Sequence, residues 1–179
     1  MRRARSGSPR ACAAEQGSMD GPAILEIDVP AEWIDSNGHL SDYAYGIAFS
    51  RALVAFLDAY GLGPAYRSRT SCAIYTLEAH LRYINEILFG DRLSIRYRIV
   101  DFDSKRLHLL LLMFDRAQVM AATYEGVLIH VRQHPDEKPR SAELEPSILK
   151  QIESAYKAQA GVLAPGLTGR AVSFKRLSA

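Results

Sequence analysis

The stretch WIDSNGHLSDYAYGIAFSRALVAFLDAY, residues 33–60, decides the fold. Its second half predicts a helix from Asp42 to about Tyr60, with Ser41 as the N-cap and the breaker GLGP at 61–64. Leu40 and Tyr45 stand at the positions of a hydrophobic staple. Strongly polar positions are few, chiefly Ser50, Arg51 and Asp58. A helix that is apolar on nearly every side has to be enclosed by other elements.

The remaining chain supplies the strands that can enclose this helix. Period-two alternation is clearest in LSIRYRIVD, where apolar side chains occupy every second position. A short first strand ends at Pro30, and longer runs rich in β-formers follow the helix. We expect strands at 23–29, 71–84, 93–101, 105–115 and 119–132.

The connections between these strands are short. FDSK (102–105) and DRAQ (115–118) are tight enough to join antiparallel neighbours as hairpins. Residues 141–161 predict a C-terminal helix, with Pro146 near its start. The predicted class is therefore α+β: a curved antiparallel sheet wrapped around one long central helix, plus a C-terminal helix.

Composition excludes several classes of protein. The 179 residues include 22 Lys and Arg against 20 Asp and Glu, and a net charge of +2 gives no reason to expect nucleic acid. No apolar run reaches the ~18 residues of a membrane span. Two cysteines, Cys12 and Cys72, cannot form a disulfide framework, so we expect a reducing, cytoplasmic location.

The first 22 residues differ from the rest. They are rich in Arg, Ser and Ala and lack apolar periodicity, which predicts a disordered tail. A second methionine, Met19, precedes the first strand, so an upstream or misassigned start explains the tail more simply than targeting does. We place one folded domain at 23–179.

The turn at 35–39, Asp-Ser-Asn-Gly-His, has the residues of a reaction site. Helix N-termini offer unpaired backbone N–H groups, which suit an oxygen that gains charge in a transition state. Gly38 lets the backbone approach a ligand, and Asp35 can act as nucleophile or as general base for water. The same residues are also ordinary turn formers, because Asp and Asn side chains bond nearby backbone.

The chain resembles the hot-dog fold acyl-CoA thioesterases, through the Asp-x-Asn-Gly-His turn and through Gly90-Asp91 before a strand. The resemblance runs from Ala23 to about Arg170. Four further segments resemble the betainyl-CoA thioesterase type of carnitine breakdown: YTLEAHLRYINE (75–86), DSKRLHL (103–109), ATYEGVLIHV (122–131) and Gly169-Arg170. This type tends to carry histidines where this chain has Tyr83 and the leucines at 109–112.

The resemblance implies roles for individual residues. Asp35 is expected to be the catalytic carboxylate, with Gly38 as a second catalytic position and Asn37 as a substrate-binding residue of the same turn. His39 is expected to orient the carboxylate, to touch the thioester or to bond locally. Glu78 is a second catalytic candidate. It shares a strand face with Thr76, His80 and Arg82, either in a solvated row or at a subunit interface, since hot-dog proteins usually pair sheets edge to edge. A homodimer or a dimer of dimers is expected.

Substrate contacts are expected from two groups. Lys105 and Arg106, or Arg170, could bind the phosphates of CoA, although charges in hairpin turns are commonly only solvated. A betaine headgroup is a quaternary ammonium that binds aromatic faces, although aromatics beside a central helix are commonly core. The aromatic candidates are Trp33, Tyr43, Tyr45, Tyr75 and Tyr83.

Other chemistries have little support. His130 and His134 are four apart, but a strand pattern and Pro135 argue against a helical metal pair, and we expect neither metal nor separate cofactor. Cys72 has no evident activating base. Two alternatives stay open: a hot-dog hydratase, whose acid-to-histidine spacing is one residue longer and includes a proline, and a non-catalytic acyl-CoA binder.

Overall fold

The computed structural model describes residues 23–134, 136–159 and 166–169. The predicted tail at 1–22 lies outside the described residues, as does Arg170. The elements of the described chain follow in this order: β1 (Leu25–Asp28), the 3-10 turn η1 (Ala31–Trp33), α1 (Asp42–Ala59), α2 (Pro64–Thr70), β2 (Cys72–Tyr83), β3 (Arg92–Phe102), β4 (Arg106–Phe114), β5 (Met120–Arg132), β6 (Arg140–Ser141) and α3 (Pro146–Ala158).

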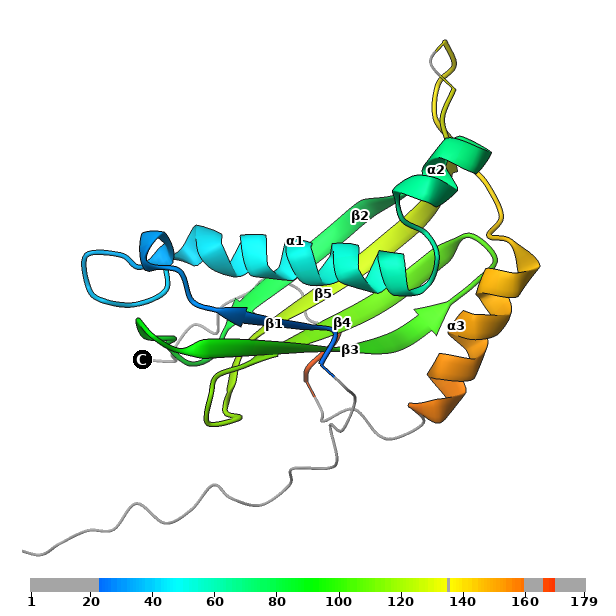
Figure 1. Ribbon diagram of the computed structural model, residues 1–179. Helices are drawn as coiled ribbons and strands as arrows, with labels where there is room; N and C mark the ends of the chain where they lie inside the picture. The colour runs from blue at the N-terminus through cyan, green and yellow to red at the C-terminus, as the bar shows by residue number, and fades with distance from the viewer. Residues whose placement is uncertain (1–22, 135, 160–165, 170–179) are drawn as a thin grey trace, which may run out of the picture.

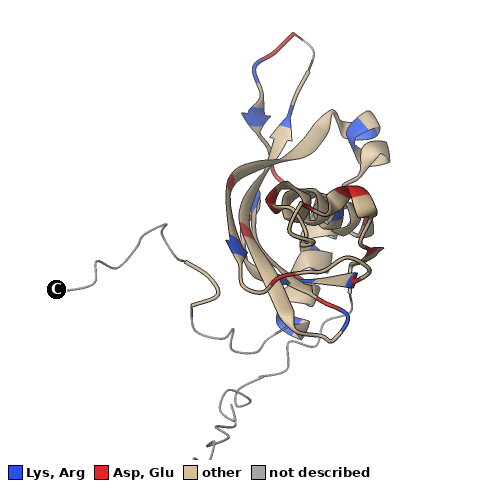
Figure 2. Cartoon of the chain, turned by 90° about the vertical axis from the view of Figure 1, so that its left-hand side faces the viewer, with Lys and Arg blue, Asp and Glu red and all other residues tan. Residues whose placement is uncertain are grey.

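The strands form one antiparallel sheet in the order β1-β3-β4-β5-β2, with the short β6 paired to β5. Both predicted hairpins, β3–β4 and β4–β5, are present. The sheet curls around α1, which lies along its concave face (Figure 1). Figure 2 looks nearly along α1 and shows the strands curving around it. The predicted α+β architecture is confirmed.

Small residues set how closely α1 approaches the sheet. Ala44, Ala48 and Ala52 recur every four residues on one side of the helix, and none of them is exposed. Phe49 and Phe56 fill the space beside this alanine row, one in each of two core clusters. The other side of α1 stays open, since Tyr43 and Val54 are each more than half exposed.

Three parts of the sequence prediction need correction. Residues 64–70 form α2 instead of a simple break, with Pro64 at the first helical position, where its missing N–H costs nothing. The strand β6 was not predicted. The C-terminal helix begins at Pro146, not at 141, because β6 pairs with β5 and the Leu144 N–H bonds to the Ser104 carbonyl.

No single helix among the described residues has the length and apolarity to cross a membrane. The pair α1 and α2 together reaches that length and composition, with a bend of 59° at the break between them.

Candidate active site

The loop at 35–39 is closed by its own backbone. An isolated bridge joins Ile34 and Leu40, the Asp35 N–H donates to the His39 carbonyl at 2.8 Å, and the Gly38 N–H donates to the Asp35 carbonyl at 3.1 Å. Gly38 has a φ of +82°, a conformation that side-chain-bearing residues rarely adopt, which explains why the loop has glycine at this position. The loop projects beyond the first turn of α1 (Figure 1).

The Asp35 carboxylate is held from within this loop. Its Oδ1 accepts hydrogen bonds from the backbone N–H groups of Asn37 at 2.8 Å and His39 at 3.1 Å. Its Oδ2 has a longer contact, 3.3 Å, from the side-chain amide of Asn37. The N–H donors of His39 and then Asn37 hold the pKa of Asp35 below its ordinary value. The side chain is exposed in the single chain and ionised at neutral pH.

The N–H groups of Asn37, Gly38 and His39 each have an acceptor inside the loop. The prediction that backbone N–H groups bind an oxyanion therefore rests on the start of α1. Ser41 occupies the N-cap of α1, but its hydroxyl makes no capping bond. The Asp42 N–H is the donor at the start of α1 without an acceptor among the described residues.

His39 has its side chain beside a second loop. Its Nε2 lies 3.5 Å from Oε2 of Glu86, and its backbone forms an isolated bridge with Leu88. The Leu40 N–H donates to the Ile87 carbonyl at 2.8 Å. Residues 84–91 therefore form one wall of the site. This contact was missed from the sequence, because only the fold brings residue 39 to residue 86.

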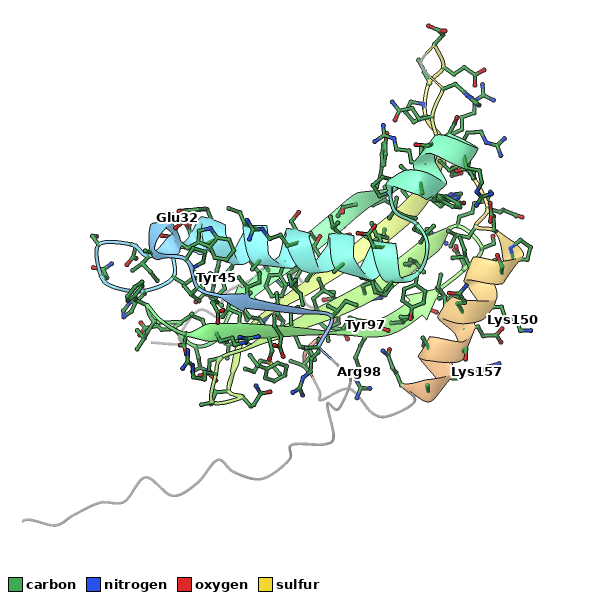
Figure 3. The ribbon with its side chains drawn as sticks, viewed as in Figure 1. Glu32, Tyr45, Tyr97, Arg98, Lys150 and Lys157 are labelled. Carbon is green, nitrogen blue, oxygen red and sulfur yellow. The ribbon has the colours of Figure 1, made fainter. Side chains whose placement is uncertain are left out.

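Two tyrosines surround the start of α1 with different exposure. Tyr45 is buried and points from α1 toward the sheet (Figure 3), and its burial raises its pKa. Tyr83 meets the Tyr45 ring edge-on at 5.1 Å and is 55% exposed. The Tyr83 hydroxyl donates to the Asp42 carbonyl at 3.4 Å. Tyr83 thus presents an exposed aromatic ring near the start of α1, where its hydroxyl contacts Asp42.

The other aromatic candidates are less available. Tyr43 is exposed, and its hydroxyl donates to the Glu32 carbonyl at 2.8 Å. Trp33 is buried, and the guanidinium of Arg51 already lies over its ring at 5.0 Å. Trp33 therefore has a cation from this chain where a ligand cation was predicted to bind.

A β-bulge at Leu77 separates residues that sequence alternation had placed together. Thr76 pairs with Leu128, which is fully buried under α1, whereas Glu78 pairs with Val127 on the opposite face. The prediction that Thr76 shares a face with Glu78, His80 and Arg82 is therefore wrong. Glu78 is exposed on the face away from α1, so a single chain does not bring it to the Asp35 loop.

The same bulge separates two tyrosines of β2. Tyr83 faces α1, while Tyr75 pairs with Ile129 on the outer face and donates to the side chain of Gln133. At roughly 3.3 Å per residue the two tyrosines are also about 26 Å apart along the strand. Tyr75 is not part of the aromatic group around α1 in this chain.

The predicted phosphate-binding pair lies at the far end of the fold. Lys105 and Arg106 are in the β3–β4 hairpin, and Arg106 is held by Asp103 through a 2.8 Å hydrogen bond from Nε. A cavity of about 250 Å³ opens there, lined in part by Arg106 and His108. Because the 18 residues of α1 span about 27 Å, this hairpin and the Asp35 loop lie at opposite ends of the molecule.

Residues considered for other chemistry have structural partners. His130 is buried, receives or donates a 3.0 Å hydrogen bond with the Tyr66 hydroxyl, and bonds through Nδ1 to the Ala142 carbonyl. Cys72 is free and buried. Within the described ranges, no group of three His, Cys, Asp or Glu residues could hold a metal ion.

Comparison with known proteins identifies the family. The model of the thioesterase-like superfamily matches residues 29–152, which include the loop, α1 and strands β2 to β6. This chain belongs to the thioesterase-like superfamily. The predicted hot-dog thioesterase family and the predicted enzyme class, a thioester hydrolase, are confirmed.

Three similar proteins with a name or a solved structure show which members of the superfamily this chain resembles. A betainyl-CoA thioesterase of Pseudomonas aeruginosa is 34% identical over 149 residues, which cover 82% of this chain and 91% of that protein. The L-carnitine dehydrogenase/betainyl-CoA thioesterase of Agrobacterium fabrum is 31% identical, but the match covers 87% of this chain and only 32% of that longer protein. A Staphylococcus aureus protein solved in complex with CoA has a TM-score of 0.78 and 31% identity, covering 84% of this chain and 94% of that one.

Proposed function

We propose that this protein hydrolyses an acyl-CoA thioester to a free acid and CoA, and that Asp35 carries the reaction. The observation that supports this most directly is the state of the Asp35 carboxylate. It is ionised, fixed by two backbone donors on Oδ1, and accessible through Oδ2, which has only the longer Asn37 contact. A fixed, ionised carboxylate beside a helix N-terminus suits attack on a polarised carbonyl.

In the proposed reaction, Asp35 takes a proton from water while the water oxygen adds to the acyl carbon. Alternatively, Oδ2 attacks the acyl carbon directly and water then hydrolyses the anhydride. In both routes the C–S bond breaks, the CoA thiolate leaves and the proton finally resides on the thiol. We propose the Asp42 N–H, which has no acceptor among the described residues, as the donor that stabilises the oxyanion.

The proposed substrate is betainyl-CoA or another short polar acyl-CoA. Support comes from the name of the Pseudomonas aeruginosa relative and from the exposed ring of Tyr83. A quaternary ammonium is attracted to an aromatic face by about 0.5–2 kcal/mol, depending on desolvation. Tyr83 offers such a face at the start of α1.

A homodimer formed through the free edge of β2 is part of the proposal. Among the described strands β2 pairs only with β5, which leaves its other edge open. Apolar side chains are exposed along this strand and on the open side of α1: Tyr75 and Leu77, then Ile47 and Val54. A second copy would bury these side chains, and a dimer of dimers is compatible with the same pairing.

A cytoplasmic location completes the proposal. The cysteine in the described chain, Cys72, is a free thiol, which suits a reducing compartment.

A panel of acetyl-CoA, butyryl-CoA and betainyl-CoA tests the proposed activity, with release of free thiol as the readout and crotonyl-CoA added as the substrate for a hydratase. A thioesterase releases thiol, a hydratase consumes an enoyl-CoA without doing so, and a non-catalytic binder does neither. Betainyl-CoA should have the highest kcat/KM of the three. Equal values for acetyl-CoA and betainyl-CoA would refute the narrower substrate assignment while leaving the thioesterase reaction in place.

A further inference from the structure

The second wall of the site contributes a carboxylate with no role so far. Glu86 lies in the loop that follows β2, and its Oε2 is 3.5 Å from His39 Nε2. Glu86 is the residue whose carboxylate forms an ion-pair contact with the His39 imidazole among the described residues. The pKa of Tyr45 is raised mainly by burial, and the negative charge of Glu86 adds to this effect.

The backbone on both sides of Glu86 is fixed, which sets the position of its Cα independently of the contact with His39. On one side the Asn85 N–H donates to the Ala121 carbonyl at 3.0 Å. On the other side Ile87 is fully buried, and its carbonyl accepts the Leu40 N–H. The chain therefore presents Glu86 to the Asp35 loop through main-chain contacts.

The consequence for His39 follows from the chemistry of imidazole. A carboxylate beside Nε2 favours the proton on that nitrogen and leaves Nδ1 as a hydrogen-bond acceptor. His39 belongs to the same loop as Asp35, and its backbone N–H bonds the Asp35 carboxylate. An oriented acceptor nitrogen there can hold the water that Asp35 is proposed to activate.

We propose that Glu86 is a positioning residue that acts through His39, setting its tautomer and ring orientation during acyl-CoA hydrolysis. The proposal rests on the proposed function of the Asp35 loop. Glu86 has a side chain that is 73% exposed, so the pair contributes little to the stability of the free chain. Its effect belongs to the complex, where substrate excludes water and catalytic contacts tighten.

A double-mutant cycle in the full chain tests this proposal. Glu86→Gln keeps the size of the side chain and removes its charge, and it should lower kcat about 10-fold with KM changed less than about 2-fold, because only orientation is lost. His39→Ala should lower kcat further, and adding Glu86→Gln to it should cost nothing more. Glu153→Gln is the matched control, since it removes an exposed carboxylate paired with Lys157 on α3.

Two results would overturn the proposal: wild-type kcat in Glu86→Gln, or an equal loss in the presence and absence of His39. Long-range ¹H–¹⁵N NMR of the imidazole provides a readout that needs no turnover. The wild type should carry the His39 proton on Nε2, and Glu86→Gln should give a mixture of tautomers. An unchanged tautomer would refute the contact even if no acyl-CoA were hydrolysed, whereas absence of hydrolysis alone would refute only the proposed function.

Discussion

Asp35 and His39 hold each other by hydrogen bonds in opposite directions. The His39 N–H donates to Asp35 Oδ1 at 3.1 Å, and the Asp35 N–H donates to the His39 carbonyl at 2.8 Å. The backbone and the carboxylate of the loop are therefore one rigid unit, in which Oδ1 is a structural atom. Oδ2 is the oxygen left for chemistry.

Gly38→Ala tests how far this unit depends on glycine. An added Cβ would meet no atom within 4 Å, so the cost arises from the φ of +82° alone, about 1 kcal/mol of unfolding free energy. Gly46→Ala is the control, because a Cβ there also meets nothing but the backbone is helical. Thermal unfolding should show Gly38→Ala less stable and Gly46→Ala equal to or more stable than the wild type. Equal destabilisation by both would contradict the strain in the loop.

Tyr83 is predicted to select a cationic acyl group. Tyr83→Ala should lower kcat/KM about 10-fold for betainyl-CoA and little for butyryl-CoA, because it removes the aromatic face. Tyr83→Phe keeps that face and should stay near the wild type. Tyr156→Ala removes a partly exposed tyrosine on α3 and should leave the ratio of the two substrates unchanged. Equal losses for both substrates in Tyr83→Ala would show that the ring does not recognise charge.

Leu77 tests the proposed dimer. It is the bulge residue on the open edge strand β2 and is 59% exposed. Leu77→Lys places a charge in the proposed interface, so sedimentation should show a shift from dimer to monomer. Ser147→Lys adds the same charge at an exposed position of α3 and should leave the dimer intact. A wild type that sediments as a monomer would rule out the pairing directly.

The ionised Asp103 is predicted to make the stability of the fold depend on pH in the acid range. The Lys105 N–H, followed by the Arg106 side chain, lowers the pKa of Asp103 below its ordinary value of 3.8. Its stabilising effect is therefore complete above that value and disappears as pH falls through the lower folded-state pKa. Asp103→Asn should have a lower Tm than the wild type at neutral pH, and the difference should shrink as the pH falls below 3.8. A difference that stays constant with pH would contradict the role of the charge.

The sequence predicted those elements whose periodicity is strong. The alternation in 93–101 and the apolar run in 43–60 correspond to β3 and α1 within one or two residues. Residues 64–70 were missed because PAYRSRT has no apolar repeat, and its helix depends on Pro64 and on burial of Tyr66. The bulge at Leu77 carried no glycine or proline signal, so the faces of β2 were assigned wrongly beyond it.

The candidate site was predictable only in its local part. Asp35, Gly38 and His39 are close in sequence, and turn chemistry indicated that they act together. The pairing of Arg106 with Asp103 is also local, and the three-residue spacing in a hairpin could have revealed it. Tyr83 was an aromatic candidate from the sequence, but its contact with Asp42 was not predicted. Glu86 was missed, because its contact with His39 depends on the fold and no local pattern contains it.

Hydrolysis of acyl-CoA by Asp35→Asn tests the central claim most directly. Asparagine retains an oxygen that can accept the N–H groups of Asn37 and His39, so the loop should keep its shape. We predict that kcat falls at least about 100-fold while the CoA ester still binds, as measured by thiol release and by calorimetry on the same protein. Undiminished thiol release from the variant would show that Asp35 does not carry the reaction.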